Sequence, residues 1–117
     1  MTQTVEQLCR LPIDFHEVGT KSLLQLIDES GYWDAPDTVT ESALANGLAA
    51  HPNWCDAWIG YSQDRRTGSG WFIEQHDDEY LVQYYPNGSN VLRFTSKHAA
   101  CAAFAIRELH SLVDRGT

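Results

Sequence analysis

The segment from Gly68 to Val113 most constrains the fold, because it has the pattern of three strands followed by one long helix. Short runs rich in β-branched and aromatic residues predict strands at residues 70–74, 80–85 and 91–94. Asn87-Gly88 separates the second run from the third, and this pair is typical of tight hairpin turns because both residues tolerate positive φ. Strands joined by such short connections predict an antiparallel meander of three strands, or slightly more.

A helix is predicted directly after the third strand. Thr95 or Ser96 can cap it, and Lys97 is then its first residue. Its apolar residues recur at helical spacing and form one stripe, which comprises Ala102, Ala105, Ile106, Leu109, Leu112 and Val113. Because a sheet and a helix each bury an apolar face by packing together, we expect this helix to lie on the sheet.

Alternation along the strands places Trp71 and Ile73 on one face of the sheet and Phe72 on the other. The second strand likewise has aromatic residues on both faces. One face is expected to meet the C-terminal helix. The second face is either partly covered by the N-terminal helices or exposed to a partner.

The N-terminal half predicts helices. A capping box with Thr4 as N-cap begins a short helix that ends before Pro12, and residues 11–19 are then expected to be a connection. Thr20 is the expected cap of a second helix over residues 21–30, after which Gly31 supplies a left-handed residue.

Two further helices are predicted before the first strand. Thr38 begins a second capping box, for a helix that ends before Pro52. Asn53 can cap the next helix, in which Trp54, Trp58 and Tyr61 recur at helical spacing, and we expect its indoles to pack on the sheet. The whole chain is thus predicted to be one α+β domain, residues 1–117: N-terminal helices, the meander and a long C-terminal helix.

The charge of the chain restricts its partners. The formal net charge is −8, and residues 11–64 contain nine acidic residues against a single basic one, Lys21. Binding to nucleic acid requires clustered Lys and Arg that neutralise phosphates, so nucleic acid is not an expected partner. An acidic surface suits a basic protein partner, although the same charge also serves solubility alone.

Several features bear on location. The N-terminal residues lack the basic and apolar regions of a signal peptide, and no run is apolar enough to span a membrane, so a cytoplasmic protein without membrane contact is expected.

The three cysteines, Cys9, Cys55 and Cys101, are widely spaced and lie beside apolar residues, which favours buried reduced thiols over a disulfide or a metal site.

The sequence contains no motif that pairs a nucleophile with its base, and no phosphate-binding glycine loop. His51 with Cys55 and His98 with Cys101 are two pairs at spacings that could bind one metal ion. A structural zinc site requires four ligands and neither pair is accompanied by a second one, so no metal or cofactor is predicted.

The most chemically pointed cluster is Asp64 with Arg65 and Arg66, because an arginine can bind phosphate or carboxylate through two hydrogen bonds. An alternative function is therefore a small hydrolase that uses Asp64, Arg65 and His76. The Asp64–Arg65 pair can equally tie the turn to a neighbouring helix. A non-enzymatic role is expected.

Two acidic segments are candidates for binding a partner. Residues 32–37 form an aromatic and acidic loop, and large rings supply much of the binding energy at interfaces. Alternatively, Trp33 plugs the core between two helices. The predicted contact residues are Asp28, Glu29, Trp33, Asp34 and Asp37, with the hairpin loop Asp77, Asp78 and Glu79 as a second candidate.

Two segments have a familiar spacing of aromatic and turn residues. They are His51-Pro52-Asn53-Trp54 … Trp58-Ile59-Gly60-Tyr61-Ser62-Gln63-Asp64-Arg65-Arg66 … Gly70-Trp71-Phe72, and Tyr84-Tyr85-Pro86-Asn87-Gly88 … Phe94 … Ala99-Ala100. Together they resemble small bacterial immunity proteins that accompany polymorphic or contact-dependent growth-inhibition toxins. The resemblance covers residues 38–113, and residues 1–37 have no counterpart in it.

The resemblance implies stoichiometric inhibition by a monomer or weak dimer, which binds a cognate toxin domain, often a nuclease, and occludes its active site. The acidic charge agrees physically, because a nuclease presents a basic cleft that carboxylates can fill. A competing hypothesis is a small acidic secretion chaperone, which would be dimeric and would hold an extended segment of an exported protein.

Overall fold

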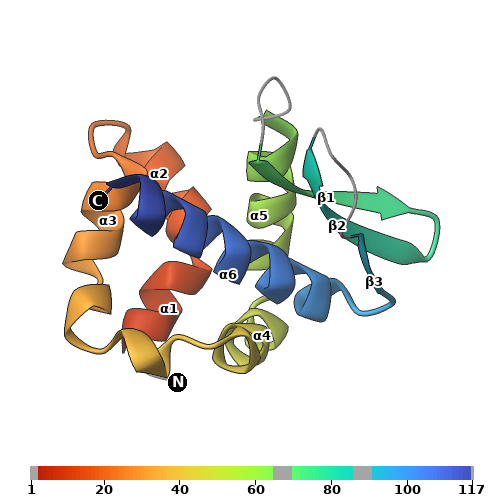
Figure 1. The fold of residues 1–117 in the computed structure, drawn as a ribbon, viewed down its shortest axis with the longest axis horizontal. Helices are drawn as coiled ribbons and strands as arrows, with labels where there is room; N and C mark the ends of the chain where they lie inside the picture. The colour runs from red at the N-terminus through yellow and green to blue at the C-terminus, as the bar shows by residue number, and fades with distance from the viewer. Residues whose placement is uncertain (1–2, 65–69, 86–90, 117) are drawn as a thin grey trace.

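The computed structural model describes residues 3–64, 70–85 and 91–116, and Figure 1 shows their α+β architecture, in agreement with the predicted fold class. In these residues six α-helices and two 3₁₀ helices accompany three strands. The elements in chain order are α1 (Gln3–Cys9), α2 (Leu11–Val18), α3 (Leu23–Glu29), η1 (Tyr32–Asp34), η2 (Pro36–Thr38), α4 (Glu41–Ala50), α5 (Pro52–Asp64), β1 (Gly70–His76), β2 (Glu79–Tyr85), β3 (Leu92–Phe94) and α6 (Lys97–Gly116).

The sheet is the predicted antiparallel meander, with the strands in the order β1-β2-β3. Ile73 of β1 lies opposite Val82 of β2, and both side chains are buried. On the same face Trp71 lies opposite Tyr84, and their rings meet edge to face with centroids 5.5 Å apart. The predicted Asn87-Gly88 turn lies outside the described residues.

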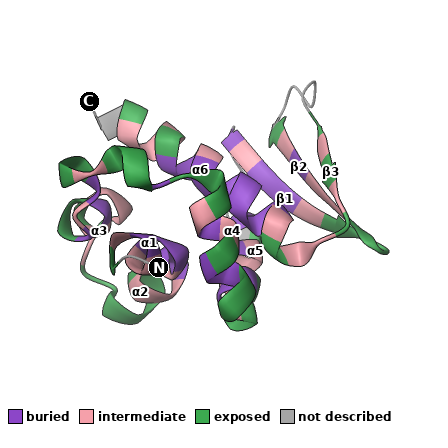
Figure 2. Cartoon of the chain, turned by 90° about the horizontal axis from the view of Figure 1, so that it is seen from below, coloured by how far each residue is buried: buried purple, intermediate pink, exposed green. Residues whose placement is uncertain are grey.

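Helix α6 packs against the sheet, as predicted, and also against the other helices (Figure 1). Residues 100–106 are all buried, and five of these seven are Ala or Cys, which permit neighbours on several sides. A helix surrounded on all sides in this way is buried through its middle rather than along one stripe. The core therefore lies around α6, with purple buried residues of α4, α5 and β1 gathered beside it in Figure 2.

The indoles of α5 contact residues outside the sheet, and their predicted packing on the sheet stays a prediction. Trp58 meets Phe104 of α6 edge to face at 5.8 Å, and its indole N–H donates to the carbonyl of Cys9 at 2.8 Å. Trp54 stacks on His51 at 3.8 Å. Helix α5 does contact β1, and Ser62, one turn after Trp58, accepts the backbone N–H of Ile73 at 3.0 Å.

Residues 11–19 are helical rather than a connection. Pro12 does not prevent this, because it lies in the first turn of α2, where backbone N–H groups have no partner within the helix. Gly19 ends the helix with φ of 72°. Pro12 is thus the second residue of α2 as well as the end signal of α1. Pro52 likewise begins α5, two residues before Trp54, which would be the first helical residue after an Asn53 cap.

Several predicted caps are displaced by one turn or less. Ser22, not Thr20, caps α3 by accepting the N–H of Gln25 at 3.1 Å. Thr40, not Thr38, caps α4. Thr4 lies within α1, and its hydroxyl donates to the carbonyl of Ser30 at 2.9 Å. At α3 and α4 the sequence offers two hydroxyl residues that are two positions apart, and the second of them is the cap. At α1 the Thr4 hydroxyl has a tertiary acceptor instead.

Helices α1, α2 and α3 do not cover the second face of the sheet. Figures 1 and 2 place α1, α2 and α3 at the end of the molecule opposite the sheet. Phe72 on that second face is nevertheless buried, at 4% exposure.

Candidate partner-binding surfaces

The first predicted set of contact residues forms one exposed surface on α3, η1 and η2. It comprises Asp28, Glu29, Trp33, Asp34 and Asp37, and we call it the acidic loop surface. Gly31, with φ of 86°, turns the chain sharply after α3. The buried ring of Tyr32 then anchors the loop in the core, so the residue that plugs the core here is Tyr32.

Trp33 instead lies at the surface with 46% of its area exposed, and the core-plug alternative for it is therefore wrong. Its indole N–H donates to the carboxylate of Asp28, and its ring meets Tyr32 edge to face at 5.4 Å. These contacts hold a large ring in a defined orientation at the surface. Glu29 forms an ion pair with Lys21 at 2.7 Å.

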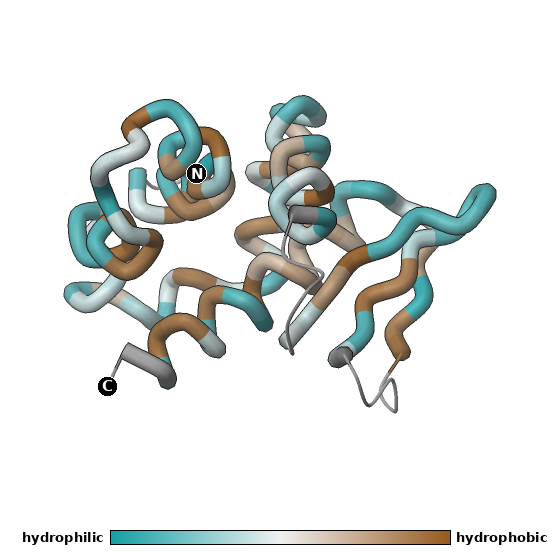
Figure 3. The backbone as a smooth tube through the Cα atoms, turned by 90° about the horizontal axis from the view of Figure 1, so that it is seen from above, coloured by the Kyte–Doolittle hydropathy of each residue, from teal (hydrophilic) through white to brown (hydrophobic). Residues whose placement is uncertain are grey.

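The second predicted set, Asp77, Asp78 and Glu79, lies in and beside the turn between β1 and β2 and is exposed. Asp77 has φ of 54°, as tight turns require. Glu79 forms an ion pair with Arg93 at 3.1 Å. The turn appears as a hydrophilic tip in Figure 3 and lies opposite the acidic loop surface along the longest axis, 36 Å, so the fold does not bring the two acidic groups together.

The enzymatic alternative required Asp64, Arg65 and His76. His76 lies exposed near the end of β1, within 3.0 Å of the carboxylate of Glu74. Asp64 ends α5, and Arg65 lies outside the described residues. In the described part of the chain no group of three or more His, Cys, Asp or Glu residues could hold a metal ion.

The three cysteines are buried, as predicted, and lie on α1, α5 and α6. Burial raises the pKa of the Cys9 thiol to about 12. A hydrogen bond with Cys55 and burial raise the pKa of the Cys101 thiol. Since the thiolate is the reactive form, these two thiols are poor nucleophiles.

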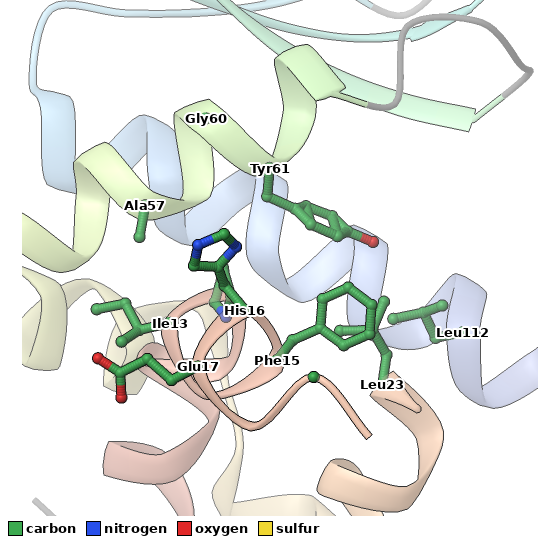
Figure 4. A pocket seen from close by; sticks show the side chains of 11 residues that line it. Ile13, Phe15, His16, Glu17, Leu23, Ala57, Gly60, Tyr61 and Leu112 are labelled. Atoms are coloured by element: carbon green, nitrogen blue, oxygen red, sulfur yellow. The ribbon is translucent and has the colours of Figure 1, made fainter. Parts of the chain in front are cut away.

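A groove between α2, α3, α5 and α6 is a surface that the sequence analysis missed. Its volume is about 770 Å³, and Ile13, Phe15, His16, Leu23, Gly60 and Leu112 are among the residues that line it. Figure 4 shows the His16 imidazole reaching from α2 toward α5, and the ring of Phe15 near Leu23 and Leu112. Treating residues 11–19 as a connection concealed this groove, although Pro12 at a first turn and Gly19 at a helix end are the signals of a helix.

Tyr61 lines the groove and connects it to the core. Its ring packs edge to face on Trp58 at 5.7 Å, and its hydroxyl donates to Glu108 Oε2 at 2.5 Å. Glu108 on α6 is fully buried. This hydrogen bond and the ring contact fix the Tyr61 side chain, so that wall of the groove is preformed.

Comparisons with models of protein families, with curated proteins and with solved structures give no match. Of the helices in the described residues, none has both the length and the apolar character needed to cross a membrane.

Proposed function

We propose that this protein is an immunity protein that binds a cognate bacterial toxin domain, a nuclease, and occludes its active site in the cytoplasm. The inhibitor acts stoichiometrically as a monomer or weak dimer, without a cofactor and without catalysis. The observation that carries the proposal is the acidic loop surface, in which an exposed Trp33 stands among four exposed carboxylates on a chain of net charge −8.

Charge and shape support this proposal in different ways. Carboxylates of the acidic loop surface complement a cleft that binds phosphates, and they accelerate association with it. Trp33 supplies the apolar anchor, because tryptophan is among the residues that contribute most to interface energy. Asp28 holds that ring in place before binding, which lowers the entropy lost on association.

The test begins with an affinity pull-down from the native cytoplasm, followed by mass spectrometry of the proteins that elute in stoichiometric amount. A folded, basic toxin domain is the expected result. Recovery of an exported protein bound through an extended segment would instead establish the secretion chaperone.

Two matched variants then locate the surface. Asp34→Lys/Asp37→Lys reverses two charges on the acidic loop surface, and Asp77→Lys/Asp78→Lys makes the same charge change at the opposite end of the molecule. We expect the first variant to bind the toxin domain at least about tenfold more weakly, which corresponds to ~1.4 kcal/mol, and the second to bind nearly normally. Equal affinity of the first variant and the wild type would remove the acidic loop surface from the site.

A further inference from the structure

The groove contains space that the folded chain itself does not use. Gly60 lies inside α5, with ordinary helical φ, and a Cβ atom placed there would meet nothing within 4 Å. Glycine inside a helix is less favourable than alanine by about 1 kcal/mol. No contact within the chain therefore excludes a side chain at position 60. A second molecule that packs closely on this wall would exclude one, and its binding would explain the glycine.

The residues around Gly60 are suited to an apolar occupant. Ala57 lies one turn earlier on the same wall of α5, so the backbone of this helix can be approached closely. Across the groove Phe15 on α2 is 39% exposed. The volume of about 770 Å³ accommodates several side chains.

The charges around the groove favour a basic occupant. In residues 3–64, which supply the α2, α3 and α5 walls of the groove, the Lys and Arg residues are Arg10 and Lys21. Each is held in an ion pair, Arg10 with Asp14 at 3.1 Å and Lys21 with Glu29 at 2.7 Å. Glu17 lines the groove and is exposed. A cation is therefore attracted to the rim of this groove and an anion is repelled.

The groove is also close to the acidic loop surface. Leu23, at the start of α3, lines the groove, and the last residues of α3 belong to the acidic loop surface. The helix has only 7 residues, so the two surfaces are separated by about 10 Å along it. One folded partner can reach both.

We propose that the groove binds the apolar face of a short amphipathic helix of the partner, whose polar face carries basic side chains. This inference rests on the proposed function, because it supplies a second contact of the same inhibitor with its basic partner. Apolar side chains of the helix insert between Phe15 and the Ala57–Gly60 wall, in the manner of other helix-in-groove complexes. Basic side chains at the rim face Glu17.

The test uses a synthetic Leu/Lys peptide of about 15 residues whose leucines fall on one helical face. A scrambled peptide of the same composition controls for attraction between opposite net charges. We expect the wild type to bind the amphipathic peptide at least about tenfold more tightly than the scrambled one by fluorescence titration. Equal binding of the two peptides would overturn the inference.

Gly60→Leu fills the groove without changing any charge. Ala49→Leu is its control, because it adds leucine at an exposed position of α4 outside the groove. Gly60→Leu is expected to fold, which its thermal unfolding curve verifies, and to bind the amphipathic peptide about tenfold more weakly, whereas Ala49→Leu binds normally. Wild-type affinity in the Gly60→Leu variant would show that the peptide binds elsewhere.

The two proposals fail in different ways. If Gly60→Leu captures the toxin domain as well as the wild type does, the groove is not a contact and the immunity function stands. If the peptide binds in the groove but no toxin domain is recovered, the groove remains a site for a basic helix and the toxin assignment is refuted.

Discussion

Removing the hydroxyl of Ser62 should measurably weaken the junction between α5 and the sheet. This hydroxyl accepts the backbone N–H of Ile73 at 3.0 Å and lies 3.4 Å from its carbonyl, and Ser62 is only 1% exposed. These backbone groups of β1 point away from β2, toward α5. Ser62→Ala therefore leaves a buried donor and a buried acceptor without this partner, which costs about 1–3 kcal/mol.

The matched control is Ser42→Ala, at an exposed position of α4. Both substitutions replace serine by alanine in a helix, so the change in helix propensity is similar and the difference between the variants isolates the lost hydrogen bonds. Urea unfolding followed by fluorescence of the four tryptophans measures the free energy of unfolding. A loss of about 1–3 kcal/mol in Ser62→Ala relative to Ser42→Ala is expected.

Amide hydrogen exchange gives a local readout of the same junction. The Ile73 amide should exchange faster in Ser62→Ala, because its acceptor has been removed and the edge of β1 is open at this residue. If the two serine variants are equally stable and protection of the Ile73 amide is unchanged, Ser62 does not close the edge of the sheet and the reasoning is refuted.

Three further outcomes are expected. Gly60→Ala should raise the free energy of unfolding by about 0.5–1 kcal/mol, because the added Cβ meets open space, and no gain in thermal unfolding would argue against that space. Thr40→Ala should lower it by about 1 kcal/mol through loss of the cap on the Ala43 N–H, whereas Thr38→Ala, outside the cap, serves as the comparison. The raised pKa of Cys9 means that the folded state keeps a proton that the unfolded thiol loses, so this group contributes a fall in the free energy of unfolding between about pH 9 and 12, of ~1.4 kcal/mol per pH unit. Cys9→Ala should remove that contribution from the pH dependence measured by urea unfolding, and an unchanged slope would contradict it.

The sequence by itself determined the elements whose signals are local. Alternating aromatic and β-branched runs identified all three strands, and the apolar stripe after Lys97 identified α6 and its contact with the sheet. The exposed acidic positions were also predictable, because charged side chains remain in water wherever the chain places them. Their role in binding stays a prediction.

Tertiary structure alone decided where these elements meet. The sequence identified the helical period of Trp58, but the position of α1 and α6 determined that its indole bonds to Cys9 and meets Phe104. Trp33 and Tyr32 are adjacent aromatic residues, and only the packing around α3 buries one and exposes the other. The groove is formed by four helices whose lining residues run from Pro12 to Leu112, so no local pattern contains it. Burial and close approach depend on neighbours distant in the chain, and these are set only when the helices and the sheet pack together.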